Sequence, residues 1–283
     1  MMRRPFHAGL PLLLLAFTLP FPLAAQSGPD LMRRAAAAHE ERLAGVENVT
    51  IVQDMMGMEA TLYMERQDVG GTPTLVPVET RVSGMTVQVP EMNNSQWSSA
   101  FQDEWIERTR AEGTELVDGR TLQVLVMDDF TGLDLSQMSG PGTEDMEILP
   151  RRIRYLMDPG DLVVRRMTME GEVERGDGRR LPFEMDMRME DYREVEGYMH
   201  PFVTRIRNAG MMEAMDVDQE EMRAQLAQMR ERWEAMPENQ RGMMGGMIRE
   251  QMERMEAMLG DDGSVEIVMT VRELRVNAGR PGR

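Results

Sequence analysis

The sequence predicts an α+β fold built on one strongly curved antiparallel β-sheet, a half-barrel of about ten strands with helices in or over its concave face. Three observations lead to this prediction. Residues 151–208 read as four consecutive strands, because apolar and polar side chains alternate and each break carries Pro, Gly or Asp. The connections are too short to hold helices, so these strands form an antiparallel meander. Sheets of this size tend to curl, which makes one face concave.

Methionine marks one face of this meander. Met185, Met187 and Met189 alternate with charged residues, and Met167 and Met169 alternate with polar ones in the same way. One face is therefore predicted to be methionine and the other charged. The chain holds 32 methionines against 4 tyrosines and 7 phenylalanines. Methionine packs adaptably, so this face is expected to fill a core, to line a ligand cavity, or to do both.

The chain begins with a segment typical of export. Two arginines precede an apolar run at residues 10–23, and Ala25 offers a small residue for cleavage. Residues 1–25 are thus predicted to be a signal peptide, and residues 26–283 a single domain. The apolar run is short for a membrane span, and no later stretch is apolar enough to be one. We expect an exported periplasmic protein that is not integral to the membrane.

Apolar spacing predicts the elements that precede the meander. Residues 29–43 form a helix, and residues 94–112 form a second one that carries three large aromatic side chains at helical spacing. These aromatic residues are expected to plug an apolar surface. Residues 130–150 lack periodicity and are predicted to be a flexible loop. Hairpins with turns that contain Gly are expected at residues 46–55 with 58–66, 74–82 with 85–89, and 115–116 with 121–128.

A pair of helices is predicted after the meander. Residues 218–235 and 240–259 carry apolar residues at spacings of three and four, and Pro237 separates them. The short turn predicts an antiparallel helical hairpin, inserted at residues 216–262 before a last strand at 264–276. This hairpin is expected either to close over the methionine face as a lid or to stand off the sheet.

Several segments resemble the LolA/LolB-like family of periplasmic lipoprotein carriers. The similar segments follow an export signal, a helix and a strand at Val49, and together extend over most of residues 30–277. They are residues 113–120 (GTELVDGR), 155–159 (YLMDP), 162–167 (LVVRRM), 191–201 (DYREVEGYMHP) and 274–279 (LRVNAG). The resemblance implies a half-barrel with a greasy cavity that carries or senses acylated ligands. The late helical pair departs from the family's pattern, and no functional residue of the family is placed on a position here.

Composition and motifs argue against several classes of function. The formal net charge of −17 disfavours binding to nucleic acid. The chain has no cysteine, and His39 and His200 are the only histidines beyond the signal segment. Both are interpreted as ordinary surface or partly buried residues, since no cluster has zinc-ligand spacing. No nucleophile elbow, phosphate loop or dinucleotide fingerprint occurs, so we expect neither an enzyme nor a bound cofactor.

The resulting hypothesis is a periplasmic protein that binds acyl chains of lipoproteins or lipids in a hydrophobic cavity without a covalent step. One alternative is an envelope sensor or scaffold whose helical hairpin docks a protein partner. Another is Cu(I) binding by thioethers, with Met252, Met255 and Met258 at suitable spacing. The candidate ligand-binding residues are a wall of Met167, Met169, Met185, Met187 and Met189, a plug of Trp97, Phe101 and Trp105, and a lid of Met222, Met229 and Trp233.

Overall fold

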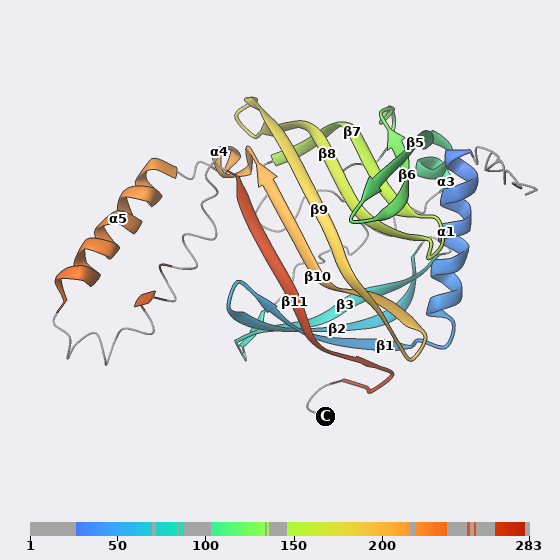
Figure 1. Cartoon of the computed structure of the whole chain (residues 1–283), viewed down its shortest axis with the longest axis horizontal. Helices are drawn as coiled ribbons and strands as arrows, with labels where there is room; N and C mark the ends of the chain where they lie inside the picture. The colour runs from blue at the N-terminus through green and yellow to red at the C-terminus, as the bar shows by residue number, and fades with distance from the viewer. Residues whose placement is uncertain are drawn as a thin grey trace, which may run out of the picture.

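A computed structural model shows an 11-stranded antiparallel sheet as the centre of the molecule (Figure 1). The strand order is β4-β3-β2-β1-β11-β10-β9-β8-β7-β6-β5. The last strand in the sequence, β11, therefore lies between β1 and β10 and joins the N-terminal hairpins to the central meander. The structure describes residues 27–69, 72–83, 85–87, 103–133, 135, 146–215, 219–236, 248–249, 252 and 264–280. The predicted signal segment lies outside these ranges and stays a prediction.

The antiparallel meander predicted from turn chemistry and alternation is confirmed. The strands are β1 (Asn48–Met55), β2 (Met58–Val69), β3 (Thr72–Val82), β4 (Met85–Val87), β5 (Arg110–Val117), β6 (Arg120–Met127), β7 (Met146–Asp158), β8 (Val163–Arg175), β9 (Arg180–Val195), β10 (Tyr198–Ala209) and β11 (Val265–Val276). The helices are α1 (Gly28–Leu43), α3 (Asp103–Arg108), α4 (Met211–Ala214) and α5 (Gln219–Ala235).

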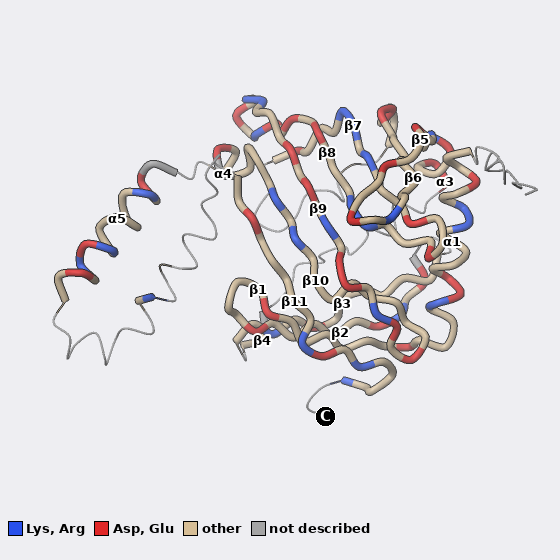
Figure 2. Tube along the Cα trace, in the orientation of Figure 1, with Lys and Arg blue, Asp and Glu red and all other residues tan. Residues whose placement is uncertain are grey.

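The two faces of the meander differ as the alternation predicts. Met167 lies opposite Met187, and Met169 lies opposite Met185, so the methionines of β8 and β9 share one face. Charged side chains occupy the other face, where Asp186 accepts hydrogen bonds from Arg166 at 2.8 Å and from Arg188 at 3.1 Å. Figure 2 shows acidic and basic segments along β9 and β10. Water solvates the charged face, so the methionine face is the one that must be covered.

Helix α1 covers part of the methionine face and connects two hydrophobic cores. Ser27 caps its first turn by accepting a hydrogen bond from the Asp30 backbone N–H at 3.2 Å. A side chain at Gly28 would meet the Thr109 carbonyl oxygen at 2.6 Å, so glycine lets the helix start close to the segment after α3. The first half of α1 packs with α3 on β6–β9, and Leu43 enters a second core with β1, β2, β3, β10 and β11.

The prediction of a strongly curved sheet is wrong. The sheet bends, and β1–β3 run at a clear angle to β9–β11 in Figure 1, but it is not a strongly curved half-barrel. A register shift between Val52 and Gln53 marks the junction of β1 with β11. Bulges of this kind turn a strand locally, so the change of direction is concentrated there. Alternation along single strands does not record where a sheet bends.

Three predicted segments also differ from the structure. The helix expected at residues 94–112 is limited to α3 within the described ranges, because residues 110–117 pair with β6 as β5. The loop expected at 130–150 ends where β7 begins at Met146. Of the predicted helical pair, only α5 is evident. The structure describes just Ile248, Arg249 and Met252 from residues 237–263, and the rest of the predicted second helix lies outside the described residues.

Candidate functional site

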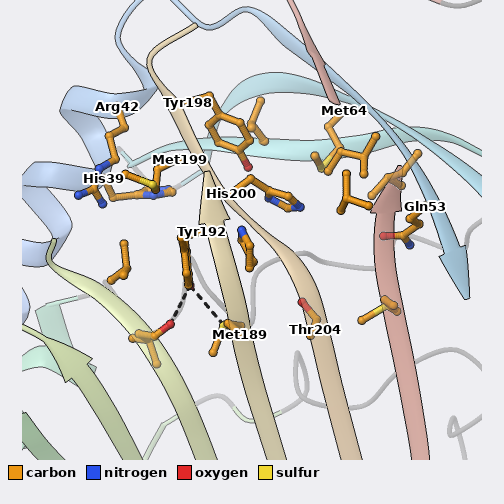
Figure 3. A pocket seen from close by; sticks show the side chains of 18 of the residues that line it. His39, Arg42, Gln53, Met64, Met189, Tyr192, Tyr198, Met199, His200 and Thr204 are labelled. Carbon is orange, nitrogen blue, oxygen red and sulfur yellow. Dashed lines mark hydrogen bonds between the residues drawn. The ribbon is translucent and has the colours of Figure 1, made fainter. Parts of the chain in front are cut away.

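The methionine face is hollow between the two cores. A pocket of ≈ 410 Å³ lies there, bounded by α1, by β1–β3 and by β8–β11 (Figure 3). Its size falls in the range of small-molecule sites, roughly 300–1,000 Å³. Side chains from β3 and β8, which are far apart in the strand order, line the same pocket. The bend of the sheet at the β1–β11 junction therefore creates the site.

Most of the pocket wall is aliphatic or thioether. The aliphatic residues come from both cores, including Ile51 and Val271 on one side and Val164 on the other. No described residue that lines the pocket is an Asp or a Glu. Such a wall suits an apolar ligand, because polar groups would be left without partners against it. Five methionines contribute to the wall: Met64, Met187, Met189, Met199 and Met269.

Helix α1 places two basic residues, His39 and Arg42, at one end of the pocket. They lie three positions apart and so share one helix face. Arg42 donates a hydrogen bond to the Asp161 carbonyl oxygen. Burial lowers the pKa of His39, and the nearby Arg42 charge lowers it further. The His39 ring is therefore neutral at pH 7, and Arg42 is the one formally charged side chain among the described residues that line the pocket.

Strand β10 contributes a second polar group, the ring pair of Tyr198 and His200. The two rings stack with centroids 5.7 Å apart and an interplanar angle of 23°. Burial raises the pKa of Tyr198 to about 12 and lowers the pKa of His200 to about 4. Both groups are thus neutral at pH 7. Figure 3 shows them directed into the pocket, where they offer hydrogen-bonding atoms in a mostly apolar wall.

Strand β9 brings Tyr192 to the same pocket through a change in its alternation. Met187 and Met189 face the pocket, so strict alternation would place Asp191 there. Asp191 instead has a φ of 50°, which shifts the pattern by one residue and turns Tyr192 inward. The Tyr192 hydroxyl donates to the Val164 carbonyl oxygen at 2.7 Å and lies 3.6 Å from the Met189 sulfur. Burial raises the pKa of Tyr192.

The structure separates the predicted wall into two groups. Met187 and Met189 line the pocket. Met167 and Met169 are buried in the core beneath α1 and α3, and Met185 packs against that core, so none of these three lines the pocket. Met167 and Met169 therefore fill space that the prediction left open for a ligand.

The predicted plug and lid do not lie over the pocket within the described residues. Trp105 is buried in the core with α1 and β6–β9, while Trp97 and Phe101 lie outside the described residues. The lid residues Met222, Met229 and Trp233 lie on α5, which stands apart from the sheet in Figure 1. The Arg249 guanidinium lies 5.8 Å from the centre of the Trp233 ring, so a residue that follows α5 in the sequence contacts a side chain of this helix.

Sequence reasoning identified only Met187 and Met189 of the pocket lining, and the polar residues that it missed include His39, Arg42, Tyr198 and His200. Their spacings were readable, because i and i+3 share a helix face and i and i+2 share a strand face. The spacing did not predict that α1 packs beside β10. Tyr192 was harder to find, since the shift at Asp191 is not visible as a Gly or Pro in the sequence.

Membrane spans and metal clusters are not found in the described part of the chain. No helix there is both long enough and apolar enough to cross a membrane. Within the same ranges, no three His, Cys, Asp or Glu side chains come together closely enough to hold a metal ion. Copper binding by thioethers uses a different ligand type, and that alternative stays a prediction.

Solved structures of three bacterial proteins are similar to this chain. A candidate outer-membrane lipoprotein-sorting protein domain from Vibrio parahaemolyticus has a TM-score of 0.42 at 10% identity and covers 90% of this chain and 94% of its own. A DUF1329 family protein from Desulfovibrio piger has a TM-score of 0.37 at 12% identity, with 89% and 93% covered. A LolA superfamily protein from Nitrosomonas europaea has a TM-score of 0.30 at 11% identity, with 89% and 96% covered.

Sequence comparisons add no relative to this set. No protein-family model matches the chain, and no curated protein matches it. One of the three structures carries the name of the superfamily that the sequence resembles. With TM-scores of 0.30–0.42 and identities of 10–12%, nothing about a ligand or a partner follows from these likenesses.

Proposed function

We propose that the protein is an exported, periplasmic binding protein that carries acyl chains of lipids or lipoproteins in the pocket between its two cores. The observation that carries this proposal is the pocket itself, ≈ 410 Å³ of space with a wall of methionine and aliphatic side chains. Each methylene moved from water to such a wall contributes about 0.8 kcal/mol. Ordering costs offset part of this gain, yet a long chain holds without any covalent step.

Methionine suits this task better than a rigid aliphatic wall would. Thioether side chains are unbranched and polarizable, so they repack around chains of different length and shape. The packed residues of the two neighbouring cores hold the frame of the pocket while its methionines adapt. The same residue type thus fills the core at one end of the face and lines the ligand space beside it.

The test is binding of a fluorescent fatty acid to delipidated protein, with a variant that fills the pocket. Val271→Phe adds a ring inside the pocket, and we expect it to weaken binding at least tenfold. Val268→Phe is the matched control, because Val268 lies on the same strand as Val271, opposite Arg205 of β10, and does not line the pocket. The proposal fails if delipidated wild-type protein does not bind the probe, or if both variants weaken binding equally.

A second candidate function is docking of an envelope protein through α5. The observation that favours it is the position of α5, which stands away from the sheet and carries half-buried Met222, Met229 and Trp233. Deletion of residues 216–262 separates the two functions. Loss of a partner from envelope pull-downs, with fatty-acid binding intact, supports docking, and unchanged capture of all partners contradicts it.

A further inference from the structure

The charged residue at the α1 end of the pocket, Arg42, has no acidic partner among the described residues. Its side chain is half-buried. Arg42 donates its hydrogen bond to the backbone carbonyl of Asp161, which lies just before β8. The Asp161 carboxylate instead binds Arg165 at 2.7 Å. Acidic residues outnumber basic ones 49 to 32 in this chain. An arginine without a carboxylate beside an apolar pocket is therefore a distinctive feature, because a desolvated charge is costly without a counter-ion.

The second observation is the position of this charge relative to the apolar wall. Figure 3 shows Arg42 and His39 together at one side of the pocket, while Met64, Met189 and Thr204 lie farther along it. The pocket thus has a cationic end and a longer, mostly apolar remainder. A guanidinium offers several N–H donors in a planar fork that matches a carboxylate or a phosphate. The arrangement is complementary to a molecule with an anionic head and an apolar tail.

The third observation is the size of the pocket. An engineered apolar cavity of about 150 Å³ holds one benzene, which has six carbon atoms. On that scale, ≈ 410 Å³ holds about sixteen carbons. This is the size of one long acyl chain, and it is too small for the two or three chains of a diacyl lipid or a lipoprotein anchor.

We propose that the pocket takes a single-chain anionic amphiphile whose head group pairs with Arg42 and whose chain lies along the methionine-lined wall. This inference rests on the proposed function and narrows it to one ligand class. The shared chemistry is one acyl chain with one anionic oxygen group, which a fatty acid supplies as a carboxylate and a lysophospholipid supplies as a phosphate.

The experiment compares ligands that differ in one feature. Affinities of delipidated full-length protein are measured for hexadecanoate, hexadecanol, 1-palmitoyl lysophosphatidate and dipalmitoyl phosphatidate, below the concentrations at which they form aggregates. We expect the two single-chain anions to bind roughly tenfold to a hundredfold tighter than the alcohol. The tighter of the two anions identifies the head group. We expect the two-chain lipid to bind more weakly than its single-chain counterpart.

Variants of α1 test the role assigned to Arg42. Arg42→Gln should remove the preference for the anions and leave the affinity for hexadecanol unchanged, while Arg42→Lys should keep part of the preference. Arg34→Gln is the matched control, because Arg34 is exposed on the same helix and does not line the pocket. Far-ultraviolet circular dichroism establishes that each variant is folded.

The outcomes separate this inference from the proposed function. If no ligand binds, the proposed function itself fails. If hexadecanol and hexadecanoate bind equally well and Arg42→Gln changes neither affinity, acyl-chain binding stands and the anionic head group is wrong. If dipalmitoyl phosphatidate binds as tightly as the lysophospholipid, the restriction to one chain is wrong.

Discussion

Two parts of the same sheet face differ in what covers them. Over β6–β9, α1 and α3 close the face, and Met167 and Met169 are buried in a continuous core. Over β10, β11 and β1, the second half of α1 reaches the face with Leu43 at its end. The space between these two contacts is the pocket, where His39 and Arg42 face the cavity.

The comparison shows that residue type alone does not determine whether a methionine is packed in a core or lines the pocket. Methionines from β8, β9 and β11 lie on this face, yet Met167 and Met169 are packed in the core while Met187, Met189 and Met269 border the pocket. The difference follows from the helix above them. Near its start α1 presents Leu31, Met32 and Ala35, which fill the gap to the sheet. One turn later it presents His39 and Arg42, whose polar ends do not pack against the apolar sheet and so leave the gap unfilled.

The largest expected effect is on stability at the covered end. Met169→Ala should lower the free energy of unfolding by about 2–5 kcal/mol, because it opens a new cavity in a packed core. Met269→Ala, in the pocket wall, should cost less than about 1 kcal/mol, since its side chain already borders open space. Urea unfolding followed by circular dichroism measures both.

Equal losses from these two variants would contradict the comparison. They would mean that the pocket wall is packed as tightly as the core. The affinity for a fluorescent fatty acid should follow the opposite order, with the larger loss in Met269→Ala, because only that side chain lines the pocket.

A smaller effect is expected from pH, and it should arise in the pocket. Burial lowers the pKa of His200 from 6.5 to about 4, so the unfolded chain takes up a proton at a higher pH than the folded protein does. Stability is therefore complete above pH 6.5 and falls as the pH drops towards 4, by at most about 3 kcal/mol. The other ionisable residues lining the pocket are His39, Arg42, Tyr192 and Tyr198.

A substitution of His200 tests whether this residue causes the loss of stability in acid. His200→Phe keeps a ring beside Tyr198 and should flatten the dependence between pH 6.5 and 4, leaving the smaller part that comes from His39. The covered core holds Tyr155, whose pKa is raised by burial, so its contribution is lost only in alkali. A pH profile that is unchanged in His200→Phe would place the acid sensitivity elsewhere.

The sequence predicts much of the fold because its signals are local. Asp158 ends β7, Asp177 and Gly197 sit in the turns after β8 and β9, and the alternation of Met185, Met187 and Met189 sets the face. The bend of the sheet was not predictable in this way, because it depends on how β11 enters between β1 and β10, far apart in the sequence.

The site was less predictable for the same physical reason. Met187 and Met189 were identified from alternation, and both line the pocket. Arg42 and His200 lie 158 positions apart, and they share a pocket only because α1 passes over β10. Met169 has the same local pattern as Met189 and belongs to the same core, but only Met189 also borders the pocket. Local spacing identifies the face of a residue, while the cover above it is set by tertiary packing.

The smallest effect is expected from removing residues 216–262, whose described members belong to neither core. Replacing residues 216–262 by a short Gly-Ser linker should change the free energy of unfolding by no more than about 0.5 kcal/mol. The join is feasible because Asn208 pairs with Val265, so the chain leaves the sheet and returns to it at neighbouring points. A short loop there costs little entropy. The affinity for a fluorescent fatty acid should also be unchanged, since no described residue of α5 lines the pocket.

The deletion also decides what α5 does relative to the open part of the face. If affinity falls while the unfolding curve stays the same, α5 closes over the pocket when a ligand binds, and Met222, Met229 and Trp233 regain the lid role that the sequence suggested. If affinity and stability both stay the same, the pocket works with α1 as its sole helical cover. The hollow between the two cores is then a property of the sheet and α1 alone, and α5 is left for contacts outside this domain.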